Sequence, residues 1–308
     1  MRILLVHNPE AGDGEPTEQR LKERLVQAGH KPIYRSAKKK GWKRALKKKP
    51  DLVLVAGGDG TVGKVAKKLI GTGLPFAVLP LGTANNLART LGFKQSQEQV
   101  IAGLAGGKRA DFDVGLARGP WGKRYFFEGV GAGLFADYLY ERKAGPAKEE
   151  RGTKAEQMKR HVKELRRRLA KHRAEEWEIK LDGKDYSGRY LLWQAMNIRS
   201  VGPVLRMASA ARMDDGAFDF VGAREEDREL LLNYLSQRLK GSNARFPLRA
   251  RRFKKMRLRW VRESLHFDDT HWPAEDEKWP KTCKIEIAVK EKALGIWKVK
   301  SRTSGTPG

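Results

Sequence analysis

The sequence predicts a two-domain protein in which an α/β domain with a parallel sheet precedes a mostly antiparallel, β-rich domain. A length of 308 residues exceeds that of one typical domain, and 40% hydrophobic content is enough to fill ordinary cores. Short apolar runs alternate with charged, helix-like segments up to about residue 108, which is the rhythm of a parallel sheet with helices. Strand-like runs then follow one another with few helices. We therefore expect domains at 1–108 and 109–300 and a disordered tail at 301–308.

The elements of the first domain follow in a regular order. Strands are predicted where apolar residues run together, at 2–6, 32–34, 51–56 and 75–81. Helices are predicted at 16–29, where Leu21, Leu25 and Ala28 fall at helical spacing, and then at 43–48 and 61–71. Two further helices, at 85–92 and 96–107, end in glycine, which favours the termination of a helix.

The second domain is predicted from a different pattern. Its strand-like runs lie at 112–117, 124–129, 176–181, 188–197, 218–223, 253–261 and 283–290. Two helices interrupt them. The first covers about 154–172, where Met158, Val162, Leu165 and Leu169 form a narrow apolar stripe, and the second covers about 225–239.

The charge of the chain is its unusual bulk property. Lys and Arg number 64 and Asp and Glu 37, which gives +27, and the excess is concentrated at 38–49, 151–173 and 245–262. The electric field of such a positive net charge attracts nucleotides, anionic lipid and nucleic acid without regard to fold. The single cysteine, Cys283, excludes an internal disulfide, and the absence of a signal-like leader or a long apolar segment predicts a cytoplasmic protein that does not span a membrane.

A glycine-rich turn is the most informative local feature. The apolar run at 51–56 leads into Gly57, Gly58, Asp59, Gly60 and Thr61 and then directly into a helix. Glycine lets backbone N–H groups approach a phosphate closely, and the positive end of the helix favours an anion. The turn matches neither the dinucleotide fingerprint nor the P-loop, which argues against a dehydrogenase and a P-loop kinase. The alternative is an ordinary glycine turn.

Four motifs in the same order together resemble the diacylglycerol kinase catalytic-domain family, which includes bacterial lipid kinases and sphingosine kinases. They are NPEAG at 8–12, GGDGT at 57–61, PLGTANNLAR at 80–89 and ARMDDGAFDF at 211–220. The segment FFEGVGAGLFAD at 126–137 is similar to the family's segment at that place. The resemblance implies an α/β nucleotide domain, a β-sandwich second domain and Mg-ATP as the phosphoryl donor to a lipid hydroxyl.

The resemblance also implies a set of nucleotide-binding residues. The first loop would wrap the phosphates together with the glycine turn, and the third motif would line the same site, at the sheet edge where ligands of α/β proteins lie. A weaker match places a residue at the end of the second strand near the nucleotide. The implied residues are Asn8, Pro9, Glu10, Ala11, Gly12, Ser36, Gly57, Gly58, Asp59, Gly60, Thr61, Thr83 and Asn85. Strand-ending turns and helix caps remain the alternative for Asn8, Pro9 and Thr83.

Three departures from the family pattern concern the same motifs. Gly63 and Lys64 stand where the family has an Asn-Glu pair, so that a cation replaces a carboxylate and could contact phosphate directly. Asn86 replaces the usual aspartate. The role of that glutamate is therefore either absent here or supplied by another residue.

The resemblance implies a metal loop in the second domain. Asp215 would be the side-chain ligand of Mg²⁺, with the backbone carbonyls of Arg212 and Ala217 as companions and with Asp214 and Asp219 nearby. Oxygen ligands suit this hard cation. Asp-Asp-Gly is also a good β-turn, which is the alternative reading.

The catalytic base of the family is an aspartate in a late Asp-Gly-Glu turn, and SLHFDDTHWP at 264–273 makes Asp268 the candidate. It would accept the proton of the lipid hydroxyl. Asp269 and Thr270 stand where glycine and glutamate are expected, and Glu275 with Glu277 in the next segment is the competing match. Asp59 is the second residue to which we assign a catalytic role.

Other functions remain open at this point. NAD kinases share the GGDGT turn, and a catalytically altered kinase could use its charge to bind anionic membrane or nucleic acid, with Trp42 and Trp260 inside its basic runs. The histidines offer no zinc site, and no Gly-x-Ser-x-Gly elbow supports a hydrolase. We predict an ATP- and Mg²⁺-dependent lipid kinase that meets its substrate at the inner face of an anionic membrane, where the basic helix near 154–172 is a candidate contact.

Overall fold

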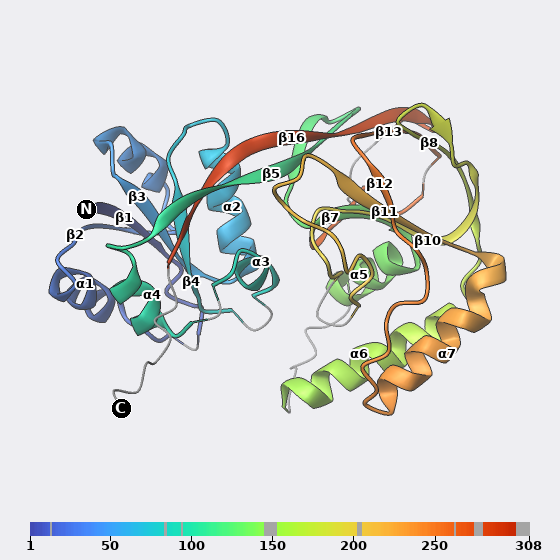
Figure 1. Cartoon of the computed structure of the whole chain (residues 1–308), viewed down its shortest axis with the longest axis horizontal. Coiled ribbons are helices and arrows are strands. Elements are labelled where there is room, and N and C mark those ends of the chain that lie inside the picture. Colours follow the sequence, from blue (N-terminus) through green and yellow to red (C-terminus); the bar gives the residue numbers. More distant parts are fainter. Residues whose placement is uncertain are drawn as a thin grey trace, which may run out of the picture. The chain divides into compact units, whose positions relative to one another are not determined.

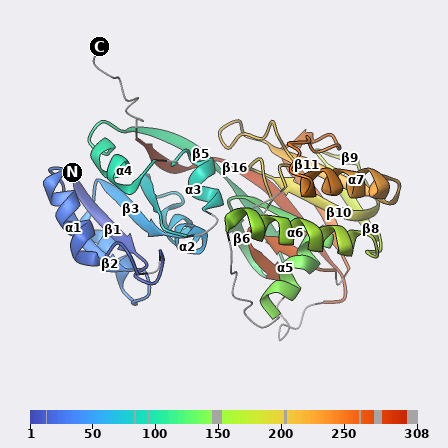
Figure 2. The same ribbon diagram turned by 90° about the horizontal axis from the view of Figure 1, so that it is seen from below.

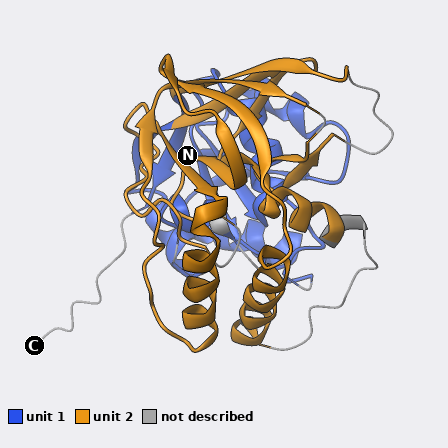
Figure 3. Cartoon of the chain, turned by 90° about the vertical axis from the view of Figure 1, so that its right-hand side faces the viewer, with its two compact units in different colours: residues 1–112, 292–308 blue, residues 113–291 orange. Residues whose placement is uncertain are grey.

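The computed structural model describes residues 1–299 except 13, 83–84, 94, 145–152, 202–204, 262 and 274–279, and of residues 86, 142–144 and 154 it describes only the backbone. These residues form two compact units, Met1–Phe112 with the segment that begins at Lys292, and Asp113–Glu291 (Figure 3). The boundary expected at residue 108 therefore lies at 112. The last residues of the expected second domain belong to the first unit, because Ile296 pairs in parallel with Phe76. The expected tail at 301–308 lies outside the described residues.

The first unit contains the predicted parallel sheet (Figure 1). Its strand order is β4-β3-β1-β2, and all of these pairs are parallel. The apolar side chains of β1, β3 and β4 are fully buried, which is why these strands read as continuous apolar runs. The elements are β1 (Arg2–His7), α1 (Glu18–Gln27), β2 (Lys31–Ser36), η1 (Trp42–Lys48), β3 (Leu52–Gly57), α2 (Asp59–Leu69), β4 (Phe76–Pro80), α3 (Asn86–Thr90) and α4 (Gln97–Gly103).

Local sequence signals set the ends of the helices in this unit. The Thr17 hydroxyl accepts a hydrogen bond from the Arg20 N–H, and Ser96 with Gln99 forms a capping box at α4. The segment at 43–48 is a 3-10 helix, η1, which lies between two left-handed residues, Gly41 and Lys49. With three residues per turn, Trp42 and Ala45 share its buried face and the lysines are exposed.

The second unit is mostly antiparallel, as predicted. Two long strands, β5 (Lys108–Gly119) and β16 (Cys283–Lys298), run from one unit into the other. One group of paired strands follows the order β15-β14-β7-β10-β11-β12, and β8 joins β10 to β13 and β16. The remaining elements are β6 (Gly122–Phe126), β7 (Gly129–Gly133), α5 (Leu134–Ala144), α6 (Lys154–Leu169), β8 (Glu175–Leu181), β9 (Lys184–Asp185), β10 (Gly188–Met196), β11 (Phe218–Arg224), η2 (Glu225–Asp227), α7 (Arg228–Leu239), β12 (Arg251–Phe253), β13 (Lys255–Trp260), β14 (Leu265–Phe267) and β15 (Thr270–Trp272).

Two apolar clusters stabilise the second unit, one on each face of β10. On one face, Trp193 packs edge-on against Trp177 of β8, with ring centroids 5.3 Å apart. Both rings belong to a cluster that also contains residues of β7, β11, β13 and β16. Leu191 and Leu192 contribute to the other cluster, which α5, α6 and α7 cover. Helices α6 and α7 lie side by side over this cluster (Figure 2). In the described part of the chain, every helix is too short or too polar to cross a lipid bilayer.

Strand β7, like helix α5 after it, is an element that the sequence did not predict. Its sequence, GVGAG, is rich in a residue that disfavours strands. The structure requires small residues there, because a Cβ on Gly131 would lie 2.2 Å from the Gln194 side chain and one on Gly129 would lie 3.0 Å from the Ala195 carbonyl oxygen. Tertiary packing therefore overrides local propensity.

The return of β16 predicts a stability effect. Ile296 is 1% exposed in the first unit, and we expect Ile296→Ala to lower the free energy of unfolding by about 2–5 kcal/mol through lost burial and the cavity left behind. Val26→Ala at a 60% exposed position is the control, with an expected change within about 0.5 kcal/mol. Urea unfolding of both variants measures the difference, and equal effects would contradict it.

Candidate functional site

The carboxyl ends of three parallel strands, β1, β2 and β3, bring the first two predicted loops and Ser36 to one edge of the first unit. The Asn8 N–H donates to the Ala56 carbonyl oxygen at 2.8 Å, and the Ala37 N–H donates to His7 at 2.7 Å. His7 of β1 pairs in register with Ser36 of β2 and Ala56 of β3. Parallel strands present their carboxyl ends on one side of the sheet, which is where ligands bind in α/β proteins.

Helix α2 begins inside the glycine turn. Gly58 is its N-cap and is extended, with φ −87° and ψ −178°, and no side chain caps the helix there. The first N–H groups of a helix have no acceptor within the helix, so this terminus suits an anion. A Cβ on Gly57 would lie 2.8 Å from the Cβ of Thr61, so glycine is needed at that position too.

The third predicted loop packs directly on the glycine turn. A Cβ on Gly82 would lie 2.6 Å from the Gly58 Cα, and one on Gly58 would lie 3.2 Å from the Gly82 Cα. The Leu81 N–H donates to the Gly57 carbonyl oxygen at 3.1 Å, and the Leu87 N–H donates to the Asp59 carboxylate at 3.0 Å. Asp59 thus joins the glycine turn to the start of α3.

The other residue predicted from this loop folds back on its own backbone. Asn85 is left-handed, with φ 47°. Its side-chain oxygen accepts a hydrogen bond from the Gly82 N–H at 2.9 Å, and its amide donates to the Gly82 carbonyl oxygen. Asn85 therefore shapes the loop that meets Gly58. Thr83 lies outside the described residues.

The first loop, at 8–12, is a tight turn of its own. The Ala11 N–H donates to the Asn8 carbonyl oxygen at 3.1 Å, and the Asn8 side chain accepts from the Glu10 N–H at 3.4 Å. Gly12 has φ +69°, and a Cβ there would lie 2.5 Å from the Glu15 carbonyl oxygen. Glu10 forms a 2.5 Å ion pair with Lys38. The loop is thereby tied to the basic segment after β2.

A hollow of about 740 Å³ lies beside the same loop. Pro9 and Ser36 line it, together with Tyr34 and Trp42 and five cations of β2 and the segment that follows it. The cations are Arg35, Lys39, Lys40, Arg44 and Lys48, against the single carboxylate of Glu18. This balance makes the hollow strongly attractive to phosphate groups.

Gly63 and Lys64, the two residues of α2 that depart from the family pattern, both lie in the described part of the structure. Lys64 donates to the Ala37 carbonyl oxygen at 3.1 Å, so its ammonium group lies at the end of β2 beside the candidate phosphate edge. Gly63 faces open space.

The two tryptophans of the basic runs are buried, Trp42 at 3% and Trp260 at 2% exposure, so neither ring is available for stacking on a base. That observation removes the aromatic argument for a nucleic-acid surface.

In the second unit, the candidate base Asp268 lies in the two-residue turn between β14 and β15. Its φ is 53°, and its N–H donates to the Gly129 carbonyl oxygen at 2.8 Å. One carboxylate oxygen accepts from the N–H groups of Phe127, Glu128 and Gly129 at 2.9, 2.7 and 3.4 Å. These bonds fix the position of that carboxylate oxygen. The competing Glu275 and Glu277 lie outside the described residues.

His266 is a buried residue of this turn that the sequence reasoning missed. Its Nδ1 lies 2.9 Å from the Asp268 carbonyl oxygen and its Nε2 lies 2.8 Å from Gln194 Oε1, and the single N–H of the neutral ring donates to one of these two oxygens. Burial lowers the pKa of His266 to about 4, so the ring is neutral at pH 7. A histidine at an inward position of a strand next to Asp268 was the available signal.

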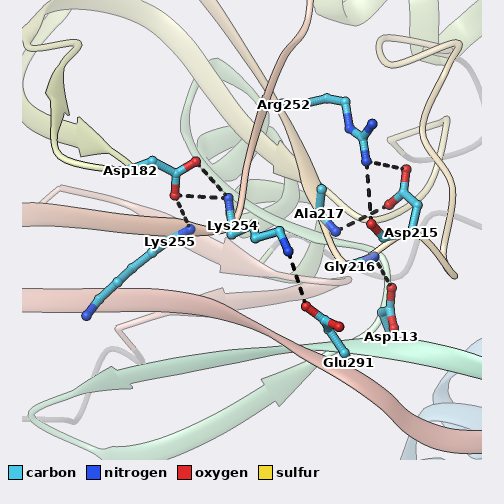
Figure 4. A network of polar contacts seen from close by, with 9 residues as sticks. All are labelled: Asp113, Asp182, Asp215, Gly216, Ala217, Arg252, Lys254, Lys255 and Glu291. Carbon is cyan, nitrogen blue, oxygen red and sulfur yellow. Dashed lines mark hydrogen bonds and ion pairs between the residues drawn. The ribbon is translucent and has the colours of Figure 1, made fainter.

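The predicted metal loop is held by the chain itself (Figure 4). The Arg252 guanidinium lies 2.9 Å from Asp215 Oδ2, and the Ala217 N–H donates to Asp215 Oδ1 at 3.3 Å. Asp113, which the sequence reasoning also missed, accepts from the Gly216 N–H at 2.7 Å and donates its own N–H to Met213 at 2.6 Å. Asp113 is 1% exposed within the apolar run of β5, and a lone acid in such a run was its signal.

The donor set of this loop does not fit the expected ion. Mg²⁺ keeps several waters and needs only one or two carboxylates from the protein, but Asp215, the one side-chain ligand expected here, already pairs with the Arg252 guanidinium. Asp219 is 6% exposed, and burial raises its pKa, with the Asp215 charge adding to the effect. Asp214 pairs with Arg212 at 3.1 Å. The structure therefore gives no support to the Mg²⁺ ligation expected of Asp215, Arg212 and Ala217.

The glycine contact predicts opposite effects for two similar substitutions. Gly82→Ala forces a Cβ against the Gly58 backbone, which cannot move aside, so we expect a loss of about 1–3 kcal/mol in unfolding free energy and weaker ATP binding. Gly63→Ala, in the open interior of α2, is expected to stabilise by about 0.5–1 kcal/mol. Urea unfolding and nucleotide titration measure both, and a neutral Gly82→Ala would refute the packing argument.

His266 predicts a pH dependence of stability. The unfolded chain takes up the proton near pH 6.5 and the folded chain near pH 4, so the unfolded state binds more protons in between and stability falls as the pH drops from 6.5 toward 4. Between pH 7 and pH 5 we expect a loss of about 2 kcal/mol that His266→Gln, which cannot titrate, does not show. Urea unfolding at the two pH values tests this, and equal slopes in both proteins would exclude it.

Comparison with known proteins finds a family model and relatives that are similar to this chain. Residues 2–117 match the family model described as the diacylglycerol kinase catalytic domain. A protein of Bacillus subtilis (strain 168) named diacylglycerol kinase is 28% identical over 208 residues, which are 65% of this chain and 64% of that protein. The match thus spans less than two thirds of that relative. A diacylglycerol kinase of Staphylococcus carnosus (strain TM300) is 23% identical over 256 residues, with 80% of each chain covered.

A solved structure shows the same fold. The crystal structure of a diacylglycerol kinase from Bacillus anthracis strain Sterne superimposes with a TM-score of 0.67 at 19% identity and covers 96% of both chains. Residues 2–117 are thus similar to the diacylglycerol kinase catalytic domain, and the whole described chain shares the fold of the solved structure.

Proposed function

We propose that the protein is an ATP-dependent lipid kinase, which transfers the γ-phosphoryl group to the hydroxyl of diacylglycerol or a related lipid alcohol. The observation that carries this proposal is the glycine turn at 57–61, which presents the uncapped start of α2 beside Gly82. Relatives named diacylglycerol kinase support a lipid acceptor over the NAD of the alternative reading.

The first unit would hold the nucleotide through backbone and charge. Phosphate oxygens would meet the N–H groups at the start of α2 and the loop at 8–12, with Lys64 and the cations of the hollow as further partners. Asp59 is the carboxylate of the glycine turn that would hold a Mg²⁺ bound together with ATP, and that ion would supply charge neutralisation at the phosphates.

The reaction would be a direct displacement. The lipid hydroxyl oxygen forms a bond to the γ-phosphorus, the bond from that phosphorus to the oxygen bridging the β-phosphate breaks, and ADP leaves. We propose Asp268 as the acceptor of the hydroxyl proton, because three backbone N–H groups fix one oxygen of its carboxylate in a turn between two strands. Thr270, where the family pattern has a glutamate, has no ionisable group.

The net charge suits an enzyme that works on a lipid surface. The chain carries +27, and α6 exposes Lys159, Lys163 and Arg167 on its surface. Each basic residue near an anionic membrane contributes about 1 kcal/mol of attraction. We therefore propose peripheral association with anionic lipid, which brings the enzyme to its substrate.

A transfer assay tests the proposed activity. Purified protein is incubated with labelled ATP, Mg²⁺ and separate acceptors, namely diacylglycerol, a sphingoid base, other lipid alcohols and NAD. Label in a lipid product supports the proposal. Transfer to NAD alone, or failure of the protein to bind any nucleoside triphosphate, would overturn it.

The base assignment predicts a large loss of activity in Asp268→Asn. The amide oxygen can still accept from residues 127–129, so the fold is retained, while the loss of the proton acceptor lowers kcat by about 10²–10⁴-fold. Asp269→Asn, at the exposed neighbour in the same turn, is the matched control with near-normal kcat. Full activity in Asp268→Asn would move the base to the segment that contains Glu275 and Glu277.

A further inference from the structure

The loop at 212–217 is surrounded by carboxylates whose charges are met by cations of this chain (Figure 4). Arg252 pairs with Asp215 at 2.9 Å, and Lys254 lies 3.5 Å from Glu291. Arg252 and Lys254 both belong to the segment around β12, which lies antiparallel to β11. One basic segment therefore supplies two counter-charges to the surroundings of the loop.

Arg252 contacts Asp215 at more than one atom. Its guanidinium donates to the carboxylate and, at 3.5 Å, to the Asp215 carbonyl oxygen. The Asp215 side chain is 20% exposed, so its charge is partly shielded from water, whereas the Arg252 side chain is 61% exposed. A guanidinium that reaches a carboxylate and a carbonyl oxygen at once does for the loop what a bound cation does, by neutralising charge and joining two of its atoms.

The loop backbone is also held by a second anchor. Buried Asp113 bonds to Gly216 and Met213, and Gly216, with φ +66°, leaves room for Glu291, whose carboxylate would lie 2.9 Å from a Cβ at that position. A divalent ion at Asp215 would have to displace Arg252 or lie within a few ångströms of its positive charge. The local charge therefore disfavours an ion.

We propose that the Arg252 guanidinium replaces the divalent cation at Asp215, so that the loop at 212–217 folds without metal. The inference is independent of the proposed activity, because it concerns the folded state of the nucleotide-free protein. The Mg²⁺ that accompanies ATP is a separate ion, and the inference makes no claim about it.

Thermal unfolding of the nucleotide-free full chain tests this inference. Wild-type protein and Asp215→Asn are unfolded in MgCl₂, in EDTA and in NaCl of matched ionic strength. We expect the same small response to Mg²⁺ in both proteins. A rise in Tm specific to Mg²⁺ in the wild type that Asp215→Asn abolishes, or a saturable Mg²⁺ site in calorimetry that needs Asp215, would overturn the proposal.

Variants of the cation test its role. Arg252→Met keeps the apolar stem and removes the charge, and we expect a Tm lower by about 2–4 °C together with a Mg²⁺-specific, Asp215-dependent recovery. Arg251→Met, at the exposed neighbour on β12, should match the wild type, and Arg252→Lys should retain metal independence. Equal Tm values for Arg252→Met and Arg251→Met would refute the role of Arg252. If Arg252→Met does not fold, the wild-type comparison with Asp215→Asn still decides.

Discussion

The architecture of the first unit depends on the backbone contact between Gly58 and Gly82. A Cβ at Gly82 would lie within 2.6 Å of the other chain segment, so no other residue permits this approach. The contact brings two strand-to-helix loops together at the sheet edge, and the bond from Leu87 to Asp59 fixes their relative position. No side chain caps the start of α2, so the groups that we propose meet an anion there are backbone N–H groups rather than side chains.

Much of this edge could be predicted because the signals are local. An apolar run, a glycine turn and a helix follow one another at 51–71, and β3 with α2 has this order in the structure. Fully buried parallel strands leave a continuous apolar pattern that a sequence shows directly. The two-domain fold class was predicted for the same reason.

The residues that the sequence did not reveal act through long-range contacts. Asp113 meets Gly216 across 103 positions, and His266 meets Gln194 across 72. Arg252 pairs with Asp215, where the family resemblance implies an ion and the DDG motif alone indicates a β-turn. The glycine at position 131 of strand β7 is required because the Gln194 side chain occupies the space that a Cβ would fill. Each of these depends on which strands become neighbours, and local patterns carry little of that information.

The path of β16 has a consequence for the order of folding during synthesis. The N-terminal strands emerge first from the ribosome, but the neighbour of β4 on its outer side is formed by residues beyond 291. Until those residues are made, β4 is an edge strand with unpaired backbone groups, which is a site for wrong pairing with other chains. The first unit is thus completed by its last strand although it begins first, and its maturation requires translation through β16.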